Sequence, residues 1–153
     1  MTKESFYQEL HAQVQAIIGD ETDTIANMAN ISALLFERLE GVNWVGFYRL
    51  VDEQLILGPF QGKVACIRIP LGKGVCGTAA AKDETQRIAD VHAFEGHIAC
   101  DAASNAEIVI PVHQNGKVVA VLDIDSVVFE RFDETDQQGL EAIVALFEQQ
   151  LSK

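Results

Sequence analysis

A chain of 153 residues is long enough for one domain with a hydrophobic core and too short for two ordinary domains. Hydrophobic residues make up 48% of it and charged residues 22%, which is typical of a globular protein and excludes a disordered one. The net charge of −12 argues against nucleic acid and anionic membranes as partners, because both are bound through lysine and arginine. The polar start at Met1–Glu4 and the absence of a long apolar run predict a cytoplasmic protein whose single domain spans 1–153.

Apolar periodicity and turn residues predict the elements of this domain. In chain order these are helices Ser5–Ile18 and Thr22–Leu39, strands Trp44–Leu50, Gln54–Phe60 and Cys66–Pro70, helix Val75–Lys82, strand Gln86–Asp90, loop His92–Asn105, strands Glu107–Val112 and Lys117–Ser126, and helix Asp133–Leu151. The pattern predicts an α+β fold with one antiparallel sheet. We expect the N- and C-terminal helices on one face of the sheet and the cysteine-bearing loops on the other.

The three cysteines, Cys66, Cys76 and Cys100, all lie in the middle of the chain. An odd count without a secretory leader makes a structural disulfide framework unexpected. For any single cysteine, burial as a small apolar residue is the commoner role. Three of them close together favour chemistry instead, as a nucleophile, a resolving thiol or metal ligands.

Three acidic residues are predicted to meet on one face of the last hairpin. Asp123 and Asp125 are two apart on a strand, so their side chains share a face. A two-residue Asn-Gly loop would pair Glu107 with Ile124 and point it away from both aspartates. A three-residue loop, Gln114–Gly116, would pair Glu107 with Asp123 and gather all three acids. An exposed acidic sheet face is the alternative, but the apolar neighbours on that face weaken it.

Four motifs resemble the free methionine-(R)-sulfoxide reductases, which are single GAF-type domains. The motifs are Asn-Trp-Val-Gly-Phe-Tyr at 43–48, Gly-Pro-Phe-Gln-Gly at 58–62, Gly-Lys-Gly-Val-Cys-Gly at 72–77 and Asp-Ile-Asp-Ser at 123–126. The resemblance implies an oxidoreductase active in oxidative stress, which reduces free L-methionine-(R)-sulfoxide by a cysteine thiolate. It further implies a sulfenic acid, an intramolecular disulfide and regeneration by thioredoxin, with no cofactor beyond that external dithiol, and a homodimer.

The resemblance also assigns roles to the cysteines. Cys100 matches the nucleophile that becomes the sulfenic acid, and Cys66 matches the resolving cysteine, so a Cys66–Cys100 disulfide is expected. Cys76 matches a third cysteine, which is either an alternative resolving thiol or part of the pocket wall.

Four other residues match substrate contacts of the same family. Glu107 and Asp125 match acids that polarise the sulfoxide oxygen, and Asp123 matches an acid at the substrate amino group. Trp44 matches the aromatic residue against which the substrate methyl group packs. The substrate carboxylate is expected at backbone N–H groups of the Cys100 loop or at the start of the Val75–Lys82 helix.

Three other classes of function compete with this interpretation. A metal site could use His92, His97 and Cys100, but there is no Cys-x-x-Cys pair, and we expect no metal. A sensory ligand-binding module would normally sit beside an output domain, and we expect none here because the whole sequence reads as one domain. A cysteine hydrolase would need an ordered Cys-His-Asn or Cys-His-Asp relay that nothing in the sequence fixes.

Overall fold

The structure, a computed structural model, describes residues 1–96 and 103–153. Its long helices are α1 (Lys3–Ile18), α2 (Thr24–Arg38) and α4 (Glu134–Leu151), and its shorter helices are α3 (Gly74–Lys82) and the 3₁₀ turn η1 (Val91–Ala93). The strands are β1 (Val42–Val51), β2 (Gln54–Gly62), β3 (Arg68–Pro70), β4 (Gln86–Ile88), β5 (Ala106–Gln114) and β6 (Lys117–Ser126). The predicted strands and helices are all present, with ends that differ by a few residues.

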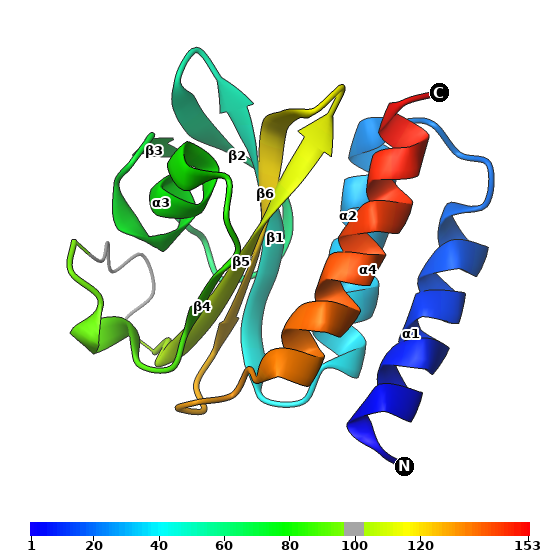
Figure 1. Ribbon diagram of the computed structural model, residues 1–153, viewed down its shortest axis with the longest axis horizontal. Helices are drawn as coiled ribbons and strands as arrows, with labels where there is room; N and C mark the ends of the chain where they lie inside the picture. Colours follow the sequence, from blue (N-terminus) through cyan, green and yellow to red (C-terminus); the bar gives the residue numbers. More distant parts are fainter. Residues whose placement is uncertain (97–102) are drawn as a thin grey trace.

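The strands of the described residues form one antiparallel sheet in the order β3-β2-β1-β6-β5-β4. Helices α1, α2 and α4 cover one face, while α3 and the segments around it lie on the other (Figure 1). The predicted α+β class and the placement of the long helices are therefore confirmed. Within this described part of the chain, none of the helices has the length and apolar character needed to span a bilayer.

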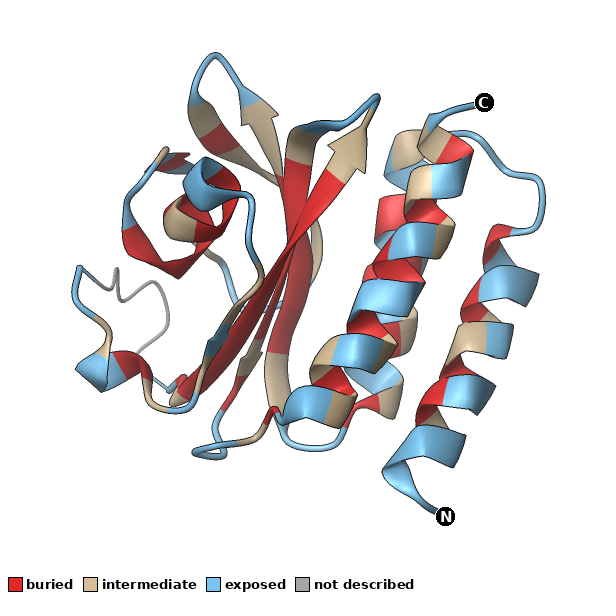
Figure 2. Ribbon diagram, viewed as in Figure 1, coloured by how far each residue is buried: buried red, intermediate tan, exposed pale blue. Residues whose placement is uncertain are grey.

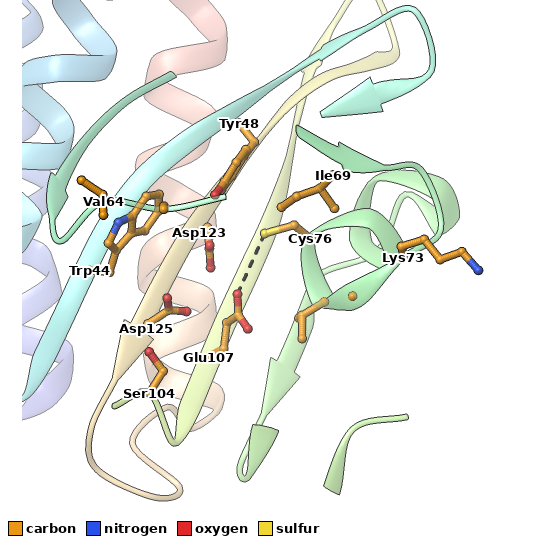
Figure 3. Close-up of a pocket in the computed structure, with 13 residues that line it drawn as sticks. Trp44, Tyr48, Val64, Ile69, Lys73, Cys76, Ser104, Glu107, Asp123 and Asp125 are labelled. Carbon is orange, nitrogen blue, oxygen red and sulfur yellow. Dashed lines mark hydrogen bonds between the residues drawn. The ribbon is translucent and has the colours of Figure 1, made fainter. Parts of the chain in front are cut away.

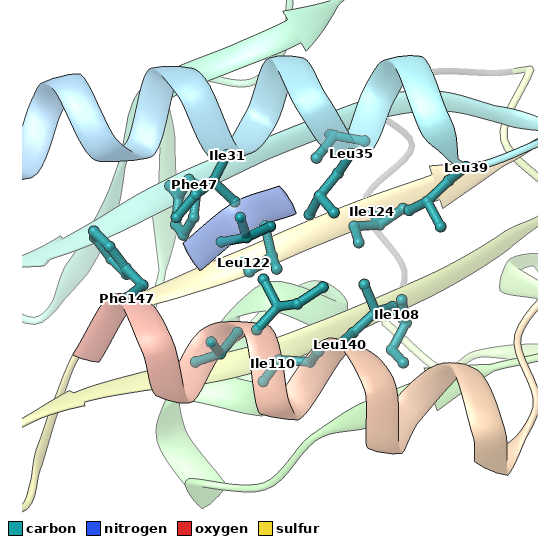
Figure 4. Close-up of a cluster of buried hydrophobic side chains, with 14 of the residues drawn as sticks. Ile31, Leu35, Leu39, Phe47, Ile108, Ile110, Leu122, Ile124, Leu140 and Phe147 are labelled. Atoms are coloured by element: carbon teal, nitrogen blue, oxygen red, sulfur yellow. The ribbon is translucent and has the colours of Figure 1, made fainter. Parts of the chain in front are cut away.

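Alternate residues of the central strands face opposite sides of the sheet, which separates the main core from the side that carries α3. On the helix side, β1, β5 and β6 contribute Val45, Phe47, Ile108, Ile110, Leu122 and Ile124. These side chains pack against α2 and α4, where Leu35 and Leu140 are fully buried (Figures 2 and 4). Burial of each such aliphatic side chain contributes roughly 2 kcal/mol, so this core fixes the sheet that carries the site.

The turn between β5 and β6 is the shorter of the two loops considered from the sequence. Asn115 and Gly116 both have positive φ, 54° and 76°, and Gln114 pairs directly with Lys117. This is the two-residue Asn-Gly loop in the primed turn geometry that suits the twist of a hairpin. The three-residue Gln114–Gly116 loop, the alternative that would have paired Glu107 with Asp123, does not form.

A bulge in β6 nevertheless brings the acids to one face. His113 pairs with Val118, but Val112 pairs with Ala120, so Val119 is an extra residue in the ladder. The insertion shifts the register by one residue and pairs Glu107 with Asp125 rather than with Ile124 or Asp123. The predicted gathering of the acids is confirmed by a different route from the one predicted.

Two predicted strand ends were also wrong. The strand expected at Cys66–Pro70 begins only at Arg68, so Cys66 precedes the ladder. The strand expected at Gln86–Asp90 ends at Ile88, because the Asp90 side chain accepts a hydrogen bond from the His92 backbone N–H at 2.9 Å and caps η1. This short 3₁₀ turn occupies the start of the predicted long loop, and residues 97–102 of that loop lie outside the described residues.

Candidate active site

Strand pairing places three of the predicted site residues on one line across the sheet. Trp44 of β1 pairs with Asp125 of β6, and Asp125 pairs with Glu107 of β5. Two residues along each strand, and so on the same face of the sheet, Gly46 pairs with Asp123. Residues paired across an antiparallel ladder share a face, so the aromatic ring and the three acids lie together on the face opposite the long helices.

The indole of Trp44 is held by aromatic rings and by two glycines. It stacks on Phe60 and Tyr48, with ring centroids 5.2 and 5.9 Å away, and its Nε1–H donates to the Lys63 carbonyl at 3.0 Å. A Cβ atom on Gly46 or Gly62 would lie 2.7 Å from an indole carbon. Both positions therefore need glycine to leave room for this ring.

A small cavity opens between the sheet and the start of α3. The empty space at this site, open solvent at its mouth included, is about 540 Å³. It is lined by Trp44, Tyr48, Val64, Ala65, Ile69, Lys73, Gly74, Val75, Cys76, Ser104, Glu107, Asp123 and Asp125 (Figure 3). Five predicted site residues meet there: Trp44, Cys76, Glu107, Asp123 and Asp125. Two of them, Trp44 and Asp125, are direct partners in the β1–β6 ladder.

Glu107 lies in a strongly perturbed environment within the acid cluster. Its side chain is buried, and both Asp123 and Asp125 lie close to it. Burial raises the pKa of the Glu107 carboxyl well above its usual value, and the charges of Asp123 and Asp125 raise it further. A carboxyl group whose pKa is raised in this way holds its proton to higher pH and can act as a proton donor inside the cavity.

Cys76 faces the same acids from the first turn of α3. Its thiol donates a hydrogen bond to Oε2 of Glu107 at 3.9 Å (Figure 3). Burial raises the pKa of the Cys76 thiol well above its usual value, and the charges of Asp123 and Glu107 add to this shift. Cys76 therefore remains a thiol at neutral pH, which makes it a poor nucleophile.

Among the described residues, Cys76, Glu107 and Asp123 lie close enough together that they could hold a metal ion. One ligand atom each from Cys76, Glu107 and Asp123 lies within 4.8 Å of the others. The metal alternative from the sequence named different residues. Of these, His92 hydrogen-bonds to Oδ1 of Asn105 at 3.1 Å, whereas His97 and Cys100 lie outside the described residues.

Cys66 lies beside the cavity rather than in its lining. It is half-buried, and its carbonyl accepts a hydrogen bond from the Tyr48 hydroxyl at 2.9 Å. Cys66 is disulfide-bonded, whereas Cys76 is a free thiol. The predicted nucleophile Cys100 lies outside the described residues, so its position relative to the cavity stays a prediction.

Sequence reasoning missed two polar residues of the lining, Tyr48 and Ser104. Tyr48 stacks on Trp44, and the strand alternation Trp44-x-Gly46-x-Tyr48 could have placed it on the same face. Ser104 accepts a hydrogen bond from the Asn43 side chain at 3.1 Å, and nothing in its sequence context marks it. Burial raises the pKa of the Tyr48 hydroxyl, so this side chain remains a neutral hydrogen-bond donor.

The start of α3 forms the remaining wall of the cavity. Gly74, Val75 and Cys76 line it, and the N-cap residue Lys73 makes no side-chain capping bond to the helix. The first N–H groups of a helix have no partner within it and attract anions. This wall is therefore a suitable place for a carboxylate, whereas the Lys73 side chain points away from the acids (Figure 3).

Comparisons with known proteins agree over nearly the whole chain. The GAF domain family model matches residues 22–151. The free methionine-R-sulfoxide reductase of Escherichia coli K12 is 56% identical over 152 residues, which cover 99% of this chain and 92% of that protein. The reduced form of fRMsr of Staphylococcus aureus is 53% identical with a TM-score of 0.94, covering 95% of both chains. The free methionine-R-sulfoxide reductase from Neisseria meningitidis, in complex with its substrate, is 43% identical with a TM-score of 0.95, covering 99% of this chain and 91% of that one.

Proposed function

This chain belongs to the free methionine-R-sulfoxide reductase family of GAF domains, and we propose that it reduces free L-methionine-(R)-sulfoxide to L-methionine. The observation that carries the proposal is the buried acid cluster at the foot of an aromatic-walled cavity. Glu107 has a proton to donate there, and two further carboxyl groups lie beside it. Sulfoxide reduction needs such a donor, because the oxygen must be protonated as it leaves sulfur.

In the proposed first step, the Cys100 thiolate attacks the sulfoxide sulfur. The oxygen is transferred to Cys100 Sγ, so methionine leaves and Cys100 becomes a sulfenic acid. Glu107 donates its proton to the sulfoxide oxygen, and Asp125, its neighbour across the ladder, helps to polarise that oxygen. The raised pKa of the Cys76 thiol keeps Cys76 protonated, which favours Cys100 as the nucleophile and leaves Cys76 as part of the pocket wall.

The remaining contacts follow from the shape and charge of the cavity. Asp123 accepts hydrogen bonds from the substrate ammonium group, and the indole of Trp44 packs against the substrate methyl group. The substrate carboxylate binds the N–H groups at the start of α3. An ammonium and a carboxylate held at once restrict the site to a free amino acid, since an internal residue of a peptide has neither group and a terminal residue has only one of them.

In the second step, the Cys66 thiol attacks the sulfenic acid. A Cys66–Cys100 disulfide forms and water leaves with the former sulfoxide oxygen. The disulfide-bonded state of Cys66 beside a free Cys76 thiol supports this pairing. A dithiol such as thioredoxin then supplies two electrons and restores both thiols. Such a cycle requires a reducing compartment, so we place the enzyme in the cytoplasm, as a homodimer that repairs oxidised methionine during oxidative stress.

The test is the turnover of free L-methionine-(R)-sulfoxide by the reduced protein with dithiothreitol, with methionine measured by chromatography. We expect many turnovers with the R epimer and none with the S epimer. Cys100→Ser should abolish even a single turnover. Cys66→Ser should release about one methionine per enzyme and then stop as the sulfenic acid, unless Cys76 replaces it.

A sensory module would give a different result in the same assay. It would bind methionine sulfoxide without releasing methionine, and tight binding without turnover would refute the proposed reaction. Turnover by Cys100→Ser would instead move the nucleophile to another cysteine. Mass spectrometry of each Cys→Ser variant after one equivalent of substrate identifies the oxidised sulfur in either case.

A further inference from the structure

The segment Lys63–Arg68, which runs from the end of β2 to the first residue of β3, exposes apolar side chains on both sides of Cys66. Val64 is 88% exposed and Ile67 is 66% exposed, and Cys66 between them is half-buried. Exposed aliphatic side chains of this size carry a solvation cost that a partner surface would remove. Here they flank a disulfide-bonded sulfur, which is itself a target for chemistry.

The same part of the chain is basic in an otherwise acidic protein. The chain has 23 acidic and 11 basic residues, yet from Gln54 to Lys82 it has four basic residues and no acidic one. Lys63 and Arg68 are exposed at the two ends of the segment, and neither makes an ion pair with any described residue. A patch with this charge would attract an acidic surface, although the protein as a whole repels one.

This segment also borders the mouth of the cavity. Val64 lines the cavity although most of its surface faces solvent, and it lies beside Trp44 at the edge of the site (Figure 3). A protein bound over Val64 and Ile67 would therefore reach Cys66 and at the same time cover the cavity entrance. The reductant and the amino-acid substrate could then not bind at the same time.

We propose that the Lys63–Arg68 segment is the docking surface for a protein dithiol reductant of the thioredoxin class, and that the reductant's thiolate attacks Sγ of Cys66. The matching surface is apolar around its reactive thiol and acidic at its rim. The proposal rests on the proposed function, because that function supplies the Cys66–Cys100 disulfide and the need for a dithiol.

The chemistry of this step balances without another reactant. The first thiolate of the reductant bonds to Cys66 Sγ, the Cys66–Cys100 bond breaks, and Cys100 leaves as a thiolate. The second thiolate of the reductant then attacks its own first sulfur and releases Cys66 as a thiolate. Two electrons pass from the dithiol to the disulfide, and the reductant becomes oxidised.

The test measures reduction of the oxidised protein by a thioredoxin of net negative charge, without any methionine sulfoxide present. Reduction by dithiothreitol serves as the control, because a small dithiol needs no docking surface. Ile67→Asp should lower the second-order rate constant with thioredoxin about tenfold. Lys63→Glu and Arg68→Glu should each lower it several-fold and weaken its dependence on salt. All three variants should react with dithiothreitol at the wild-type rate.

Two matched variants control for a general effect of new charge. Ile25 in α2 is 61% exposed, and Lys117 is exposed at the tip of the β5–β6 hairpin. Ile25→Asp and Lys117→Glu should keep the wild-type rate with both reductants. Unchanged thioredoxin rates in the Ile67 and Arg68 variants, or equal losses with both reductants, would overturn the docking surface.

The attacked sulfur is identified by trapping the reaction half-way. A thioredoxin whose resolving cysteine is replaced by serine should form a mixed disulfide on the peptide that contains Cys66. A mixed disulfide on Cys100 would overturn this part of the proposal. Neither of these experiments uses methionine sulfoxide, so they test the docking surface separately from the reductase activity. Failure of the turnover assay would refute the proposed function, whereas normal turnover with unchanged thioredoxin rates in the variants would refute the docking surface alone.

Discussion

Replacement of Glu107 by glutamine tests two consequences of its raised pKa: proton donation during catalysis and a loss of fold stability as the pH rises. Glutamine keeps the shape of the side chain and can still accept the hydrogen bond from Cys76. It loses the transferable proton, and general acid catalysis contributes about 10² to 10⁴ in rate. We expect Glu107→Gln to lower kcat/KM about 100-fold, or about 2.7 kcal/mol in the transition state, with little change in substrate binding.

The same substitution should stabilise the fold at neutral and alkaline pH. Burial and the charges of Asp123 and Asp125 raise the pKa of Glu107, so the folded protein keeps a proton that the unfolded chain loses as the pH rises past 4.5. The free energy of unfolding of the wild type then falls by about 1.4 kcal/mol per pH unit until the folded cluster also ionises. Glu107→Gln has no proton to lose at this position, so its free energy of unfolding should not fall in this way. The difference in stability between the variant and the wild type should therefore grow with pH.

Urea unfolding of the reduced protein, followed by circular dichroism at pH 5.5, 6.5 and 7.5, measures this difference. Turnover followed to higher pH gives the kinetic profile, which should fall for the wild type only where the buried Glu107 carboxyl loses its proton. Glu37→Gln on the exposed face of α2 is the matched control and should behave as the wild type in both assays. A stability difference that stays constant with pH, or kcat/KM within twofold of wild type, would refute the argument.

Three further predictions test the surroundings of this cluster. Gly46→Ala should cost about 1–3 kcal/mol in thermal unfolding and raise KM, because its Cβ would lie 2.7 Å from the Trp44 ring. Cys76→Ser should change KM more than kcat in steady-state assays, since burial holds the pKa of this thiol too high for it to attack; loss of the first turnover would contradict this. Asp133→Asn should destabilise the protein at pH 7, because the Asp136 backbone N–H and Lys3 lower the pKa of Asp133 to about 2. In urea unfolding this difference should shrink as the pH falls from 3.8 to 2, whereas a difference that persists at pH 2 would exclude a charge effect.

The sequence was sufficient to predict the fold because its two sheet faces have different chemistry. Apolar residues at alternate positions, such as Leu122 and Ile124, mark the side that packs on the helices. The acids Asp123 and Asp125 between them mark the other side. The pocket lining was harder to predict, because residues such as Ser104 reach the cavity from a loop that has no periodicity.

The ends of the strands could not be read from propensity alone. The β-branched and aliphatic run Cys66–Pro70 suits a strand, yet only Arg68–Pro70 pairs with β2. Residues 63–67 instead pass the edge of the cavity, where the Lys63 and Cys66 carbonyls accept hydrogen bonds from Trp44 and Tyr48. Tertiary contacts to two aromatic side chains thus override a local preference that the sequence expresses clearly.

The bulge at Val119 shows how two local preferences of the hairpin are reconciled. The Asn-Gly turn favours a two-residue loop, which by itself would place Glu107 opposite Ile124 and so on the face that packs against the helices. A carboxyl group there would be buried among aliphatic side chains without partners, at a cost of several kcal/mol. One extra residue in β6 retains the favoured turn and keeps the apolar residues of both strands on the helix side. It also sets Glu107 beside Asp125, so the register that the core requires is the register that builds the acid cluster.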